Sequence, residues 1–205
     1  MRVNAGGSPP GSTKKRYEKV VLVHGYTSSP SKQRYQIIAE ELNRLGIEYA
    51  IPALPGDEDP QAKEWLETIN REIKNTNLPI VLVGHSLGTR AILLYLDQYN
   101  VVVDTVILIA TFNNDIETNR DRKDQHYASF FEYKLDIKKI KNLANHFIVI
   151  HSKDDDTIDY QQAVDISKEL GARLITYNHA GHFSGKENAT DNANIFLEAI
   201  KSAIS

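Results

Sequence analysis

The sequence predicts an α/β protein in which a mostly parallel sheet of about six strands carries helices on both faces, giving three layers. Short apolar runs alternate with stretches of helical spacing along the chain. These runs are apolar at successive positions, which is typical of parallel strands buried on both faces. The residues best suited to chemistry each follow a predicted strand, at the sheet edge where such proteins bind ligands.

The strands are predicted from runs rich in branched apolar residues and bounded by Gly, Pro, Asn or Asp. They cover residues 19–23, 47–51, 80–83, 105–110, 147–151 and 173–177. Because strands alternate with helices, we expect right-handed crossovers between parallel strands.

The helices are predicted from apolar residues that recur every three to four positions. We expect them over about 31–45, from about 60 to 73, directly after residue 88, and over about 136–142, 160–170 and 191–204. In the first helix, Ser31 is the expected cap and Gly46 the expected end. The side chains expected on its buried face are Ile37, Ile38, Leu42 and Leu45.

One segment, residues 113–133, fits neither pattern well. It is polar and irregular, with four aromatic residues in its second half, and a helix is plausible from about Gln125. A connection of this length often forms a lid or a binding wall. Its aromatic side chains could equally serve as anchors on the core, and the sequence leaves both interpretations open.

The composition is that of an ordinary globular protein, with 41% hydrophobic and 25% charged residues. The net charge of -3 gives no general attraction to nucleic acid, and no apolar run is long enough to cross a membrane. The absence of cysteine excludes disulfides and a cysteine nucleophile, and suits a cytoplasmic location. We expect residues 1–18, which are rich in Gly, Ser and Pro, to be a flexible leader, and residues 19–205 to form a single domain.

The most informative motif is Gly84-His85-Ser86-Leu87-Gly88, which fits the pattern G-x-S-x-G. It lies between a buried strand and an apolar helix, the context of a nucleophile elbow. In such a turn the serine occupies strained backbone, and its hydroxyl projects above the sheet edge. Ser86 is therefore the candidate nucleophile.

A serine hydroxyl needs a base, and the base needs a carboxylate to orient it. On this fold the expected chain order is Ser, then Asp or Glu, then His. Three aspartates follow the fifth strand, and Asp155 is preferred over Asp154 because it begins an Asp-x-x-Ile spacing whose Ile158 can pack under the loop. His182 follows a glycine after the last strand and can reach the elbow; His179 is the alternative.

The other histidines are expected to have structural or surface positions. His85 should point away from the nucleophile, His24 should shape its loop through hydrogen bonds, and His151 should be packed. His126 and His146 are expected on the surface.

A tetrahedral intermediate also needs two N–H donors for its oxyanion. We expect them to be the backbone N–H groups of Leu87, next to the nucleophile, and of Tyr26, in the loop after the first strand.

With these residues in place, the chain resembles the α/β-hydrolase superfamily, and within it the small serine hydrolases of the retinoblastoma-binding protein 9 and YdeN type. The resemblance begins near Lys19 and extends to the end of the chain. It rests on the stretches 23–26, 54–66, 84–88, 152–155 and 181–183. It implies a compact sheet with little cap, and Ser86, Asp155 and His182 as the catalytic triad.

The predicted function is hydrolysis of a carboxylic ester or related acyl compound through an acyl-enzyme, with no metal and no cofactor. Peptidase, thioesterase and acyltransferase reactions would use the same residues. The alternative is a protein-interaction module on a hydrolase scaffold with weak activity. The expected partner is a small acyl or ester substrate rather than nucleic acid or membrane, and a protein partner is possible.

Overall fold

The computed structural model describes residues 18–112 and 126–204. Its strands are β1 (Lys19–Val23), β2 (Glu48–Ala50), β3 (Ile80–His85), β4 (Val103–Ile109), β5 (Ala144–Ser152) and β6 (Arg173–Tyr177). They form a six-stranded sheet in the order β2-β1-β3-β4-β5-β6. Every neighbouring pair is parallel, so the predicted fold class is confirmed.

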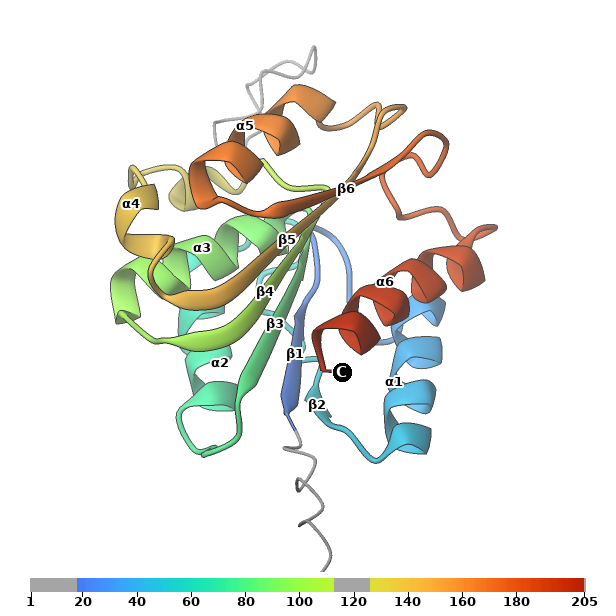
Figure 1. The fold of residues 1–205 in the computed structure, drawn as a ribbon, viewed down its shortest axis with the longest axis horizontal. Helices are drawn as coiled ribbons and strands as arrows, with labels where there is room; N and C mark the ends of the chain where they lie inside the picture. Colours follow the sequence, from blue (N-terminus) through green and yellow to red (C-terminus); the bar gives the residue numbers. More distant parts are fainter. Residues whose placement is uncertain (1–17, 113–125, 205) are drawn as a thin grey trace, which may run out of the picture.

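Helices cover the sheet on both faces (Figure 1). Helices α1 (Gln33–Leu45) and α6 (Ala189–Ala203) lie on one face. The other face carries α2 (Ala62–Ile73), α3 (Leu87–Tyr99), α4 (Ile137–Ile140) and α5 (Tyr160–Leu170). A short 3-10 helix, η2 (Ala128–Phe130), precedes α4.

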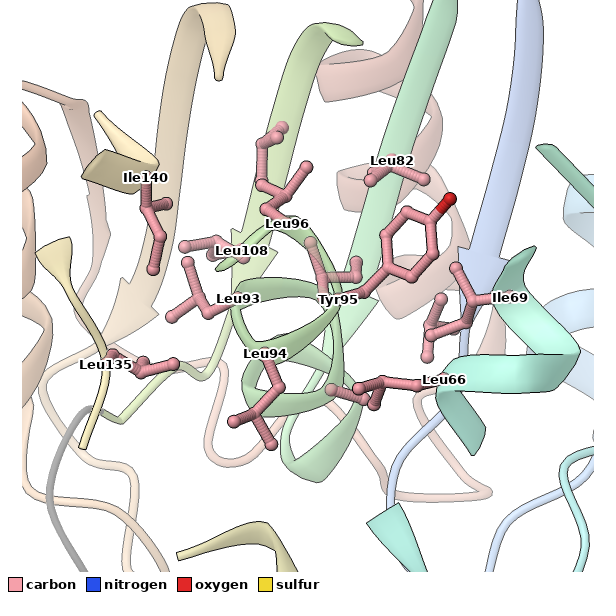
Figure 2. Close-up of a cluster of buried hydrophobic side chains, with 14 of the residues drawn as sticks. Leu66, Ile69, Leu82, Leu93, Leu94, Tyr95, Leu96, Leu108, Leu135 and Ile140 are labelled. Carbon is pink, nitrogen blue, oxygen red and sulfur yellow. The ribbon is translucent and has the colours of Figure 1, made fainter. Parts of the chain in front are cut away.

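The core is divided by the sheet into two apolar layers because successive strand residues point to opposite faces. In β1, Val20 and Leu22 pack with α1 and α6, whereas Val21 and Val23 pack on the other side. Helix α3 is buried continuously from Leu87 to Leu96, which explains why this stretch is apolar except at Thr89 and Arg90. Figure 2 shows its leucines between the sheet, α2 and the segment that leads into α4.

The first helix differs from the prediction at its start and on its buried face. It begins at Gln33 after an extended Lys32, and no side chain caps it, so Ser31 is not the cap. Leu45 is 37% exposed, whereas Arg34 and Tyr35 are buried. Gly46 ends the helix in the left-handed conformation, as predicted.

The segment predicted to be irregular is described only in part. Residues 113–125 lie outside the described ranges, as do residues 1–17 of the predicted leader. From His126 onward, the expected helix is only the short η2. Phe130 is buried there against Trp65, with ring centroids 5.1 Å apart, so this aromatic residue is an anchor.

All the candidate residues follow the carboxyl ends of β1, β3, β5 and β6. Because these strands are parallel, their ends meet at one edge of the sheet. In the described part of the chain, none of the helices combines the length and the apolar character that a membrane span requires.

Candidate active site

Ser86 occupies the strained backbone position predicted for it. Its φ of 52° and ψ of -124° are rarely adopted by a residue with a Cβ, at a typical cost of about 1–3 kcal/mol. The turn closes tightly because its glycines lack side chains: a Cβ at Gly88 would lie 2.2 Å from the carbonyl oxygen of Val23. At Gly84, a Cβ would lie 2.9 Å from the backbone nitrogen of Thr89.

Ser86, His182 and Asp155 form one hydrogen-bonded row. Nε2 of His182 lies 3.0 Å from Oγ of Ser86, and Nδ1 lies 2.9 Å from Oδ2 of Asp155. Because a carboxylate can only accept, Nδ1 carries the proton and the Nε2 lone pair faces the serine hydroxyl. The Asp155 carboxylate is buried and also accepts the N–H groups of Thr157 and Ile158, at 2.9 and 3.0 Å.

Asp154 binds the backbone of the loop that carries His182, whereas Asp155 binds the imidazole ring. Its Oδ1 accepts the N–H of Gly181 at 2.9 Å, the N–H of Ala180 at 3.2 Å and the hydroxyl of Ser152 at 2.5 Å. The bond from Ser152, followed by that from Gly181, lowers the pKa of the Asp154 carboxyl. Asp154 thus shapes the turn that carries His182.

The remaining candidates of this region lie on the surface. Asp156 is exposed and accepts the hydroxyl of Thr157 at 3.1 Å. The side chain of His179 is 90% exposed, and its Nδ1 is 3.8 Å from Asp154. His126 and His146 are also exposed, as predicted.

Two buried histidines flank the row. Nε2 of His85 donates to the carbonyl oxygen of His182 at 2.8 Å, so His85 supports the loop rather than the nucleophile. Nε2 of His151 lies 3.1 Å from the carbonyl oxygen of Ile158 and 3.4 Å from Oδ2 of Asp155. Burial lowers the pKa of both imidazoles, which keeps them neutral.

The contact between His151 and Asp155 was missed by sequence reasoning, which predicted only that His151 is packed. The available signal was its position at the end of β5, four residues before the candidate acid.

His24 fixes the loop that follows β1. Its Nε2 accepts the N–H of Leu54 at 3.3 Å, so Nδ1 carries the proton and donates to the carbonyl oxygen of Gly25 at 2.9 Å. Gly25 packs directly on the nucleophile, since a Cβ there would lie 3.1 Å from Cβ of Ser86. Tyr26 follows at once, and its hydroxyl donates to the carbonyl oxygen of Glu58 at 2.8 Å. The predicted donor loop therefore lies against Ser86.

Leu87, the other predicted oxyanion donor, is the first residue of α3. Its N–H is one of those that a helix leaves without an intrahelical acceptor. The positive end of the helix dipole adds to the favourable field for negative charge beside Ser86.

Arg90 links the elbow helix to the segment around η2 and was also missed by sequence reasoning. Its Nε donates to the carbonyl oxygen of Phe130 at 2.9 Å, and its Nη2 to that of Tyr133 at 2.7 Å. Burial lowers the pKa of the guanidinium to about 10. The aromatic ring of Tyr127, in this segment, lies 5.2 Å from that of Tyr26.

A cavity of about 600 Å³ opens beside the row and includes both Ser86 and His182 in its lining. Its other walls come from the loops after β1, β5 and β6 and from the starts of α1 and α6. Across residues 18–112 and 126–204, no cluster of three or more His, Cys, Asp or Glu side chains could hold a metal ion.

Comparison with known proteins places this chain in a family. Residues 20–193 match the Serine hydrolase family. YdeN of Bacillus subtilis (strain 168) is 29% identical over 175 residues, which is 84% of this chain and 90% of YdeN.

Solved structures agree with this match. The crystal structure of the ydeN gene product of B. subtilis has a TM-score of 0.79 at 26% identity, covering 91% of this chain and 98% of that one. Est1E from Butyrivibrio proteoclasticus has a TM-score of 0.65 at 16% identity, covering 92% of this chain and 90% of that one. The strand–elbow–helix unit around Ser86 is typical of the α/β-hydrolase fold. The chain has the fold of the α/β-hydrolases, belongs to the serine hydrolase family and is a hydrolase.

Proposed function

We propose that this serine hydrolase cleaves carboxylic esters of small acyl compounds through a triad of Ser86, His182 and Asp155. The observation that supports this most directly is the hydrogen-bonded row, with 3.0 Å between Ser86 and His182 and 2.9 Å between His182 and Asp155. Both distances lie within the range needed for proton transfer and for orientation of the imidazole.

In the proposed reaction, Oγ of Ser86 attacks the acyl carbon while Nε2 of His182 takes its proton. The bond to the leaving alcohol then breaks, and His182 returns the proton to the alcohol oxygen, leaving an ester between Ser86 and the acyl group. A water molecule attacks this acyl-enzyme as His182 takes its proton. When the second intermediate collapses, the bond between Oγ of Ser86 and the acyl carbon breaks, His182 returns the proton to Oγ, and the acid is released. Asp155 stabilises the imidazolium without accepting its proton.

The backbone N–H groups of Leu87 and Tyr26 are the proposed donors to the oxyanion of each tetrahedral intermediate. Two features of the site favour this assignment: Leu87 begins α3, and the Gly25–Tyr26 loop packs on Ser86. A single donor of this kind typically lowers the activation barrier by about 3–4 kcal/mol.

Esters are the first substrates to test because similar solved structures include Est1E with ferulic acid bound and carboxylesterases of Nitrososphaera gargenis. A series of p-nitrophenyl esters with graded acyl length measures turnover and chain preference together. Ser86→Ala and His182→Ala should each lower kcat by at least roughly a thousandfold.

The matched controls are Ser202→Ala and His179→Ala, which change exposed residues outside the row. Both should keep turnover, and a fluorophosphonate probe should label the wild type but not Ser86→Ala. Equal activity in wild type and Ser86→Ala would contradict the proposal, and a folded protein without labelling or turnover would favour an interaction module.

A further inference from the structure

The cavity beside Ser86 carries one sign of charge. Lys32, Arg34 and Lys186 contribute to its lining. Within residues 18–112 and 126–204, no Asp or Glu lines it. The chain as a whole has a net charge of -3, so the positive lining is a local property of the site. A cleft lined by one sign of charge concentrates ligands of the opposite sign.

Arg34 is the most informative of the three cations because it is only 7% exposed. Its guanidinium donates to the carbonyl oxygen of Phe183 and to the hydroxyl of Tyr35, and it lies over the Tyr35 ring at 4.7 Å. These groups are neutral, and no carboxylate in the described ranges pairs with it. Its Nε is buried without a hydrogen-bond acceptor in the same ranges. A buried cation with a spare donor is costly unless an anion joins it.

Helix ends add to the positive potential. Helix α1 begins at the cavity with Gln33 and Arg34, and it has neither a side-chain cap nor an acidic residue in its first turn. Helix α6 begins with Ala189, which also lines the cavity, although Asp191 in its first turn reduces its field. These two helices lie side by side on one face of the sheet (Figure 1). Exposed N–H groups at a helix start bind anions.

From these observations we infer that the substrate of this hydrolase carries a carboxylate, held by Arg34 together with Lys32 and Lys186. The inference rests on the proposed function, because it assigns the substrate class of the same site. Arg34 supplies the buried positive charge for that carboxylate, and the two lysines supply further charge around it. The ester carbonyl meanwhile faces Ser86 and the proposed oxyanion donors.

The experiment compares each ester that carries a free carboxylate with the neutral compound in which that carboxylate is methylated. On the acyl side, the p-nitrophenyl monoester of adipic acid is compared with its methyl ester; the long chain disfavours attack by the substrate's own carboxylate. On the leaving-group side, meta-carboxyphenyl acetate is compared with its methyl ester. We expect kcat/KM for the charged member of at least one pair to exceed that of the neutral member by roughly tenfold or more, mainly through KM.

Variants then test whether the cavity cations cause this preference. The preference is the ratio of kcat/KM for the charged substrate to kcat/KM for the neutral one. The double variant Lys32→Gln/Lys186→Gln should reduce this ratio several-fold and weaken its dependence on salt concentration. Arg34→Gln should reduce the ratio further, with circular dichroism to check folding; if that variant does not fold, the lysine pair decides the outcome. Lys63→Gln removes an exposed lysine of α2 that does not line the cavity, and it should leave the ratio unchanged.

Two negative outcomes are distinct. If hydrolysis depends on Ser86 but neither charged ester is preferred, or the preference survives both sets of cavity variants, this inference is overturned and the proposed function stands. If no ester is hydrolysed in a way that depends on Ser86, the proposed function fails and the inference fails with it.

Discussion

Asp154 and Asp155 are adjacent in the chain, yet they hold different parts of one histidine loop. Oδ1 of Asp154 accepts the backbone N–H of Gly181 at 2.9 Å, while Oδ2 of Asp155 lies 2.9 Å from Nδ1 of His182. One carboxylate thus fixes the backbone turn and the other fixes the ring. This division of roles explains why neighbouring residues of the same type can have very different effects when substituted.

The first prediction separates these two aspartates. Asp155→Asn should lower kcat by about 10⁴, because an amide can stabilise the wrong imidazole tautomer and does not stabilise the imidazolium. Asp154→Asn is the matched control. Asparagine keeps an oxygen that can accept the Gly181 N–H, so kcat of this variant should fall by less than roughly tenfold. Steady-state kinetics on one p-nitrophenyl ester measures both. Similar losses in the two variants would show that the acid is assigned wrongly.

The second prediction concerns pH and stability. Burial lowers the pKa of His24, His85 and His151 below the ordinary value of 6.5. The unfolded chain therefore binds protons that the folded chain excludes, so stability is full above the unfolded pKa and is lost as the pH falls. We expect the free energy of unfolding to decrease between about pH 7 and pH 5, by up to about 1.4 kcal/mol per pH unit for each histidine.

Urea unfolding at several pH values measures this slope. His151→Gln should flatten it, whereas His146→Gln, which changes an exposed residue of the same strand, should not. An unchanged slope in His151→Gln would show that this imidazole titrates normally in the folded protein.

The third prediction isolates the strain at the elbow. Ser86→Gly and Ser86→Ala both remove the hydroxyl, but only glycine adopts a φ of 52° with a ψ of -124° without strain. Ser86→Gly should therefore be more stable than Ser86→Ala by about 1 kcal/mol or more in urea unfolding. Ser31 is exposed and has no positive φ, so the order of stability should be the opposite there: Ser31→Ala should be more stable than Ser31→Gly. Equal stability of the two Ser86 variants would mean that the turn relaxes.

The fourth prediction tests the close approach of α3 to β1. Gly88→Ala places a methyl group 2.2 Å from the carbonyl oxygen of Val23, which is backbone and cannot move aside cheaply. Gly46→Ala also replaces a glycine, but nothing lies within 4 Å of the added Cβ. The substitution is disfavoured only by the φ of 68°, which a residue with a Cβ rarely adopts. We expect about 1 kcal/mol of destabilisation for Gly46→Ala and at least twice that for Gly88→Ala, measured by thermal unfolding.

Much of the fold was predictable because its signals are local. Apolar runs bounded by turn residues located β1 and β6 at their observed ends, and helical spacing located α5 from Tyr160 to Leu170. The family and the hydrolase class were also predicted correctly, since the motif around Ser86 and its strand–helix context are contained in one stretch of sequence. The roles of Ser86, His182 and Asp155 as a triad stay a prediction, as do the leader and the single domain.

The features that were missed depend on packing between distant segments. Burial of Arg34 follows from its position between Tyr35 and the carbonyl oxygen of Phe183, 149 residues further along the chain. The expectation that Ser31 caps α1 was wrong because the helix starts at Gln33 and Lys32 occupies the cap position. Ser31 instead hydrogen-bonds with Ser29 at 2.8 Å. Neither arrangement leaves a periodic signal in the sequence.

The order of the sheet also affects how copies of this chain meet one another. Its outermost strands, β2 and β6, have only three and five residues, and they carry the charged residues Glu48 and Arg173. Short, charged border strands are poor templates for backbone pairing between molecules. The long apolar strands β3, β4 and β5 are shielded between neighbours, so the sequences most prone to intermolecular aggregation are exposed only when the sheet itself comes apart.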